Sequence, residues 1–169
     1  MDVTPDPRML RMLGEIEFDE WQCLAELIDN SFDAFLKQKR AGITPGPGGW
    51  KVSIELPRKM DDEPVVVVSD SGPGMTKTEL ESSVRAGFSS NDSVSNLGLF
   101  GMGFNVATAR LGDRTHVSTC TAEDDFWNSV DIDFQSLIES RSFTAKESVS
   151  EKTNSEEHGT RIEISRLRP

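Results

Sequence analysis

Three short segments carry side chains whose types and spacing suit the binding of a nucleotide. In the first, Glu26, Asn30 and Asp33 are spaced by four and three residues, which places all three on one face of a helix. An amide oxygen such as that of Asn30 suits Mg²⁺, which keeps most of its waters and bridges phosphates. A glutamate one turn away can accept a proton from an attacking water. The alternative interpretation is a solvated polar face with chance spacing.

The second segment, residues 70–75, reads Asp-Ser-Gly-Pro-Gly-Met and follows four valines and a serine. A carboxylate at the end of such an apolar strand is partly buried and can accept a hydrogen bond from an exocyclic amine such as that of adenine. Gly72 and Gly74 allow the backbone to turn sharply and to approach a flat ring. An ordinary Asp-Ser-Gly turn explains the same residues equally well.

The third segment, residues 98–103, reads Gly-Leu-Phe-Gly-Met-Gly and leads into a helical pattern at Phe104. Glycines that open a helix present backbone N–H groups to a phosphate. The segment is not a Walker loop, because no Gly-Lys-Ser/Thr follows, and no strand directly precedes it as in a dinucleotide fingerprint. A polar stretch rich in Ser and Asn precedes it, which favours a hinged, mobile lid over phosphates. A flexible surface loop is the alternative.

The elements that must position these segments follow from apolar periodicity and from capping signals. We expect helices from Asp19 to about Lys39, over 76–86 with Thr76 as its cap, and over 103–111. We expect strands at about 50–56, 65–68, 114–121, 126–134 and 160–165, with a solvated hairpin loop at 145–158. This order predicts an α+β sandwich of two layers, in which three or four helices cover one face of a mixed, mostly antiparallel sheet.

Length and composition restrict the function further. A chain of 169 residues suits one domain, residues 1–169, with a real core. The net charge of −11 repels phosphate backbones, so nucleic acid is not an expected partner of this domain alone. No apolar run is long enough to span a membrane. Cys23 and Cys120 lie far apart without metal-type spacing, which indicates buried, reduced thiols in a cytoplasmic protein.

Taken together and in this order, the three segments resemble the motifs of the GHKL ATPase superfamily, whose members include gyrase B, heat-shock chaperones, histidine kinases and MutL-type proteins. Residues 26–34, Glu-Leu-Ile-Asp-Asn-Ser-Phe-Asp-Ala, are similar to its N-box. Residues 70–75 resemble its adenine motif and residues 98–103 its ATP-lid motif. A fourth match is Gly159-Thr160 before a late strand. The resemblance extends from about residue 10 to residue 164 and implies the Bergerat fold.

The resemblance implies a role for each matching residue. Glu26 would be the general base, Asn30 the Mg²⁺ ligand, and Asp70 the acceptor for adenine N6. Thr160 would support Asp70 through a shared water. The adenine pocket would be lined by Asp33, Ala34, Gly72, Gly74 and Met75. The phosphates would be held by the lid and the start of the next helix, that is by Asn91, Gly98, Leu99, Phe100, Gly101, Met102, Gly103 and Phe104.

The activity that the resemblance implies is Mg²⁺-dependent ATP binding with slow ATP hydrolysis. Lid closure would drive formation of a homodimer, and the wording of the lid is most similar to the MORC and chaperone branches. In those branches a following domain supplies a basic residue to the γ-phosphate, so we expect this chain either to be the N-terminal part of a longer protein or to borrow that residue in trans. A non-hydrolysing ATP-binding module is the alternative. A histidine-kinase-like phosphotransferase is disfavoured, because His116 and His158 lie outside any helix before the N-box and are interpreted as structural or solvated.

Overall fold

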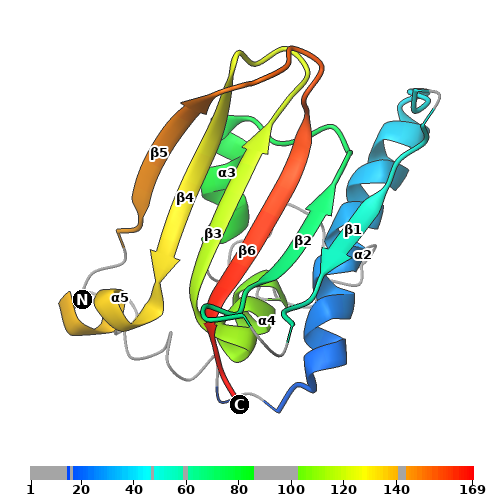
Figure 1. The fold of residues 1–169 in the computed structure, drawn as a ribbon. Coiled ribbons are helices and arrows are strands. Elements are labelled where there is room, and N and C mark those ends of the chain that lie inside the picture. Colours follow the sequence, from blue (N-terminus) through cyan, green and yellow to red (C-terminus); the bar gives the residue numbers. More distant parts are fainter. Residues whose placement is uncertain (1–14, 16, 47, 59–60, 86–102, 141–143) are drawn as a thin grey trace, which may run out of the picture.

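The computed structural model describes residues 15, 17–46, 48–58, 61–85, 103–140 and 144–169. Its strands form one sheet in the order β1-β2-β6-β3-β4-β5 (Figure 1). The strands are β1 (Val52–Glu55), β2 (Val66–Asp70), β3 (Gly112–Cys120), β4 (Phe126–Asp133), β5 (Lys146–Glu151) and β6 (Gly159–Leu167). The last strand in the sequence therefore lies in the middle of the sheet, between β2 and β3.

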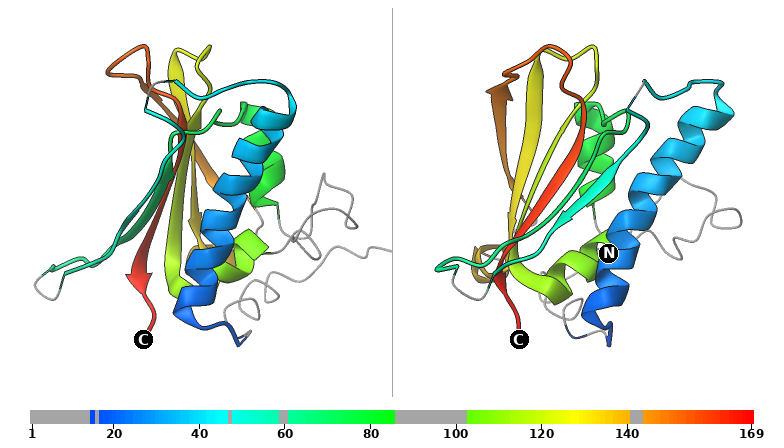
Figure 2. Two further views of the ribbon diagram at one scale, coloured as in Figure 1. Left: turned by 90° about the vertical axis from the view of Figure 1, so that its right-hand side faces the viewer. Right: turned by 45° about the vertical axis from the view of Figure 1, so that its right-hand side comes forward.

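The described helices are α2 (Glu20–Arg40), α3 (Lys77–Val84), α4 (Gly103–Leu111) and α5 (Phe134–Ser140). Helices α2, α3 and α4 lie on the same face of the sheet, which Figure 2 shows nearly edge-on. This arrangement confirms the predicted α+β fold. The expected parallel component of the sheet is wrong for the described strands, since all five pairings are antiparallel. Strands β2 and β3 run in the same direction, but β6 separates them.

Helix α2 is defined by signals at both of its ends. The Asp19 N–H donates to Oε1 of Gln22 at 2.9 Å, which satisfies a backbone group at the start of the helix. Basic residues in the last turn complement the helix dipole. The chain leaves the helix at Gly42, whose φ is +80°. The buried face is one row at steps of four residues: Cys23, Leu27, Ser31 and Phe35.

The core lies between the sheet and these helices. Each strand alternates, so one set of side chains points to the helices and the other to the open face. The helix-facing set forms one buried cluster with α2, α3 and α4 and includes Val66, Val68, Val117, Val130, Ile132, Ile162 and Ile164. Both cysteines are fully buried and free, as expected. Among the described residues, no helix is long and apolar enough to cross a membrane.

Two elements differ from the sequence-based expectation. Residues 146–151, expected to lie in a loop, form the edge strand β5, which pairs with β4 although its six residues are all exposed. Strand β5 is therefore held by its backbone hydrogen bonds to β4 and not by the burial of apolar side chains. Helix α5 was not expected either, because Phe134 continues the apolar pattern of β4. The helix begins there because Oδ1 of Asp133 accepts the Ser136 N–H at 3.1 Å, as an N-cap residue does.

Two glycines permit a close approach of backbone segments where β2 and β3 end and β6 begins. Gly159 has a φ of +124°, and a Cβ there would lie 2.1 Å from the carbonyl oxygen of Asp70. Gly74 has a φ of +71°, and a Cβ there would lie 1.8 Å from the carbonyl oxygen of Cys120. Any larger residue at either position would have to move the backbone. The turn after β2 is therefore held directly against β3 and β6.

We expect Gly159→Ala to lower the free energy of unfolding by roughly 2–3 kcal/mol, because it combines a disfavoured φ with a backbone collision. The matched control is Gly46→Ala, where a Cβ would meet nothing within 4 Å. Urea titrations of both variants measure the difference. Equal stability of the two variants would contradict the close approach of β6 to Asp70.

Candidate functional site

The centre of the candidate site is the carboxylate of Asp70, the last residue of β2. Its Oδ1 accepts the Gly72 N–H at 2.8 Å, and its Oδ2 accepts the hydroxyl of Ser31, from α2, at 3.1 Å. Burial raises the pKa of Asp70, and the donors from Gly72, Ser31 and the backbone of Thr160 oppose this rise only in part. Asp70 is thus a half-buried, oriented hydrogen-bond acceptor, which is the property that the sequence predicted for it.

An apolar wall lies beside this carboxylate. A Cβ at Gly72 would lie 2.8 Å from Cε1 of Phe35, so the ring of Phe35 packs directly against the turn. Phe35 is stacked on Trp50, with ring centroids 5.4 Å apart and an interplanar angle of 12°. Phe35 itself is buried, so the turn that carries the Asp70 acceptor rests on an apolar base formed by two stacked rings.

The hydroxyl of Thr119 joins three segments behind the turn. It donates to the carbonyl oxygen of Gly159 at 2.9 Å and accepts the N–H of Met75 at 2.9 Å. The hydroxyl of Thr160 lies 3.2 Å from it and completes its hydrogen bonding. Thr119 is fully buried. The turn after β2 is therefore fixed to β3 and β6 by side-chain bonds as well as by close backbone contact.

A second carboxylate, that of Glu26, lies against the start of α4. A Cβ at Gly103, the first residue of α4, would lie 2.4 Å from Oε2 of Glu26. Helix N-termini favour negative charge, so this is a suitable place for a carboxylate and for phosphates. Burial, followed by the charge of Asp29, raises the pKa of Glu26. A raised pKa brings a glutamate closer to the range in which it acts as a general base near neutral pH.

Helix α2 brings these two places together. Glu26 and Ser31 are five residues apart, which corresponds to about 7.5 Å along a helix axis. Glu26 lies against the start of α4, and Ser31 donates to Asp70. Of the other residues predicted on α2, Asn30 is exposed, whereas Asp33 and Ala34 are half-buried.

Of the remaining predicted residues, some lie in the described part of the chain and the others lie outside it. Gly103 begins α4, and Phe104 packs against the core. The side chain of Thr160 contacts Thr119, and its residue pairs with Asp70 in the sheet, so the proposed shared water stays a prediction. Outside the described residues lie Asn91, Gly98, Leu99, Phe100, Gly101 and Met102.

Sequence analysis did not assign Ser31, Thr119 or His158 to the site. Ser31 carried a signal, since it is the polar member of the otherwise apolar row on α2. Thr119 carried none, because a threonine is ordinary in a strand. His158 was interpreted as structural or solvated, and the structure places its Nδ1 2.6 Å from the carbonyl oxygen of Gly72. Each of these contacts joins residues at least 39 positions apart in the chain.

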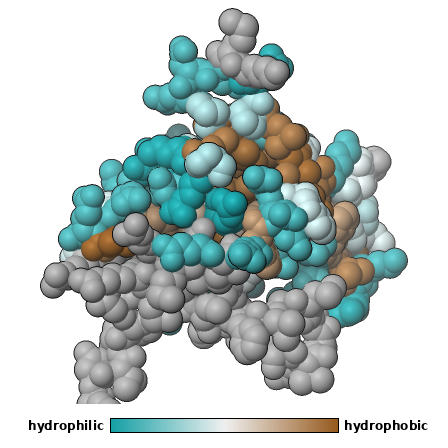
Figure 3. Space-filling model, turned by 90° about the horizontal axis from the view of Figure 1, so that it is seen from below, coloured by the Kyte–Doolittle hydropathy of each residue, from teal (hydrophilic) through white to brown (hydrophobic). Residues whose placement is uncertain are grey.

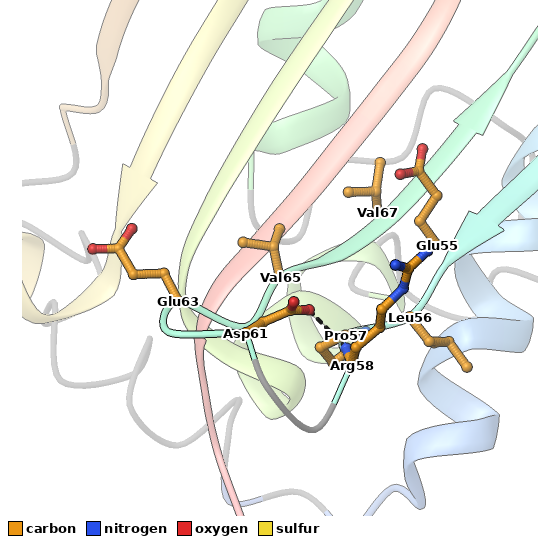
Figure 4. Close-up of a pocket in the computed structure, with 8 residues that line it drawn as sticks. All are labelled: Glu55, Leu56, Pro57, Arg58, Asp61, Glu63, Val65 and Val67. Carbon is orange, nitrogen blue, oxygen red and sulfur yellow. Dashed lines mark hydrogen bonds between the residues drawn. The ribbon is translucent and has the colours of Figure 1, made fainter.

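A separate hollow of about 520 Å³ lies at the opposite end of β2, where the β1–β2 hairpin bends (Figure 4). Its polar lining is mostly acidic, and Asp61 accepts the Arg58 N–H at 2.7 Å. Three carboxylates beside one arginine disfavour a polyphosphate. The hollow is lined by Glu55, Leu56, Pro57, Arg58, Asp61, Glu63, Val65 and Val67.

Some large apolar side chains remain exposed. Three side chains of α2 lie on a face that the buried row does not use: Trp21, Phe32 and Leu36 are 65%, 51% and 47% exposed. Seen from below, apolar surface lies among polar side chains (Figure 3). Helix α2 therefore presents apolar side chains to solvent as well as to the core.

The structure is a two-layer α+β domain with an antiparallel sheet, helices on one face, a half-buried carboxylate at a strand end and a glutamate against the start of a helix. The family model described as Histidine kinase-, DNA gyrase B-, and HSP90-like ATPase matches residues 17–160, and the chain belongs to this family. Members of the family generally bind ATP and act as ATPases or kinases. No curated protein matches the chain significantly.

We expect Asp70→Asn to change the pH dependence of stability. The folded-state pKa of Asp70 lies above its unfolded value, which is about 3.9. The folded state therefore holds the proton more tightly, so the contribution of Asp70 is complete below the unfolded pKa and declines as pH rises through the folded pKa. The free energy of unfolding of the wild type minus that of the variant should fall over this window and then become constant. Urea titrations across the acidic range measure it, and a difference that grows with pH would contradict the assignment.

Proposed function

We propose that this protein binds Mg²⁺-ATP along α2, with adenine at Asp70 and the phosphates near the start of α4. The observation that carries the proposal is that one helix contacts both places, through Ser31 at Asp70 and through Glu26 at Gly103. Membership of an ATPase family supports the same assignment. Adenine N6 would donate to the Asp70 carboxylate, and the ring would lie along the Gly72 turn.

The residues present fit ATP and one Mg²⁺ ion. A Cβ at position 72 would collide with Oδ1 of Asp70 and with the ring of Phe35, so glycine is required for the chain to pass this close to the carboxylate. Asn30 offers an exposed amide oxygen on the same helix, and no group of three or more His, Cys, Asp or Glu in the described part of the chain could hold a metal. One protein ligand is sufficient for Mg²⁺ that retains waters and bridges phosphates. The ion would neutralise charge on the transferring phosphoryl group.

Hydrolysis would begin with a water placed between Glu26 and the γ-phosphate. Glu26 would accept a proton from this water while the water oxygen forms a bond to the γ-phosphorus. The bond from that phosphorus to the bridging oxygen of the β-phosphate breaks, and ADP and inorganic phosphate leave. The net charge of the chain is negative and does not attract the phosphates of ATP, so hydrogen-bond donors within the site must hold them.

We further propose that ATP controls association between copies of the chain, in the manner of the MORC or chaperone branches. The resemblance of the lid segment supports this branch. The exposed apolar side chains of α2 support a surface that can associate. In this scheme hydrolysis is slow, and association between copies is the step that ATP controls.

We expect Glu26→Gln to lower ATP turnover at least about a hundredfold while leaving the Kd for ATP within about twofold, since the variant removes the base and keeps the shape. The matched control is Glu20→Gln in the first turn of the same helix, which should leave both quantities unchanged. Phosphate release and calorimetric titration provide the two measurements. Unchanged turnover in Glu26→Gln would exclude Glu26 as the base, and saturable binding without any ADP formation by the wild type would favour the non-hydrolysing module.

We expect Asn30→Ala to weaken ATP binding in the presence of Mg²⁺ by roughly fivefold to tenfold, as loss of one polar contact does. Binding in the presence of a chelator should not change, because the amide acts through the ion. Calorimetric titrations with and without Mg²⁺ separate the two cases. A similar loss under both conditions would contradict the assignment of Asn30 as the metal ligand.

A further inference from the structure

His158 joins the end of the β5–β6 connection to the turn that follows β2. Its Nδ1 lies 2.6 Å from the carbonyl oxygen of Gly72, which is 86 residues earlier in the chain. A carbonyl oxygen only accepts hydrogen bonds, so Nδ1 of His158 must carry the hydrogen. The neutral ring is therefore the Nδ1–H tautomer, with Nε2 unprotonated.

This bond acts on the candidate adenine acceptor through a single residue. The N–H of Gly72 donates to Oδ1 of Asp70 at 2.8 Å, and the carbonyl of Gly72 accepts from His158. Gly72 is thus held on both sides, by the carboxylate and by the imidazole. Since glycine has the freest backbone of all residues, this turn needs such restraints to keep one conformation.

The connection that carries His158 is itself anchored. Oε2 of Glu157 accepts the Trp127 indole N–H at 2.8 Å, and its Oε1 accepts the Asn154 N–H at 3.1 Å. On the other side of His158, Gly159 lies against the backbone of Asp70. The ring therefore extends from a backbone that is fixed both before and after it.

We propose that His158 is a positioning residue for recognition of the adenine base, acting through Gly72 on the orientation of Asp70. The proposal rests on the proposed binding of adenine at Asp70. Without the imidazole, the peptide group that follows Gly72 loses its restraint, the backbone torsions of Gly72 are freer, and its N–H becomes a donor of less fixed direction for the Asp70 carboxylate. Binding of adenine nucleotides should weaken, and so should discrimination between adenine and guanine, because guanine carries a carbonyl oxygen, which cannot donate, at the position of the adenine amine.

The test compares His158→Leu with His158→Asn by calorimetric titration of the whole chain with ATP and with GTP. Leucine removes the donor, whereas the amide nitrogen of asparagine occupies the place of Nδ1. We expect His158→Leu to raise the Kd for ATP about fivefold to tenfold and to lower the ratio of the GTP and ATP Kd values, as loss of one hydrogen bond predicts. His158→Asn should restore most of both quantities. The control is His116→Asn, at a histidine whose Nε2 contacts Ser118 in the sheet, and it should bind like the wild type.

Asp70→Asn separates failure of this inference from failure of the proposed function. If Asp70→Asn abolishes ATP binding and His158→Leu retains wild-type affinity and selectivity, the role of His158 is overturned. If Asp70→Asn binds ATP normally, the adenine assignment fails, and the inference fails with it. Nitrogen NMR of the histidine ring provides a readout independent of nucleotide. The Nδ1–H tautomer supports the contact with Gly72, and the Nε2–H tautomer overturns it.

Discussion

The structure depends on the burial of one carboxylate at the end of β2. An ionised group removed from water is costly unless donors replace its hydration. For Asp70 these donors come from its own turn and from α2, through Gly72 and Ser31. The Ser31 hydroxyl therefore links the helix, which the core already holds, to the end of the strand. Burial raises the pKa of Asp70 despite these donors. A carboxylate has about four lone-pair sites, so the bonds from Gly72 and Ser31 leave acceptor capacity for a ligand.

The surroundings of this carboxylate are rigid because backbone segments approach each other closely there. Gly74 and Gly159 allow the turn to contact β3 and β6, and the buried hydroxyl of Thr119 fixes the same three segments. A site built on a sheet and a capped helix is more precise than one built on loops. Glu26, on the same helix as Ser31, is thereby held at a defined separation from Asp70.

Much of this arrangement was predictable from sequence, for reasons that differ between elements. Periodicity and caps predicted α2, α3 and α4, and four consecutive valines predicted the strand that ends at Asp70. The edge strand β5 was not predicted, because all its side chains are exposed and backbone pairing leaves no pattern in the sequence. Motifs predicted roles for Glu26 and Asp70, which stay predictions. The tertiary fold alone brings Ser31 to Asp70, Thr119 to Met75 and His158 to Gly72.

The most direct test of the account is a crystal structure of the protein with Mg²⁺ and a non-hydrolysable ATP analogue. We predict adenine N6 within about 3.0 Å of a carboxylate oxygen of Asp70, the ring against the Gly72 turn, and the phosphates at the start of α4 beside Glu26. A nucleotide bound elsewhere, or an Asp70 carboxylate that contacts only Gly72 and Ser31 while adenine lies apart from it, would contradict the central claim that this buried carboxylate recognises the base.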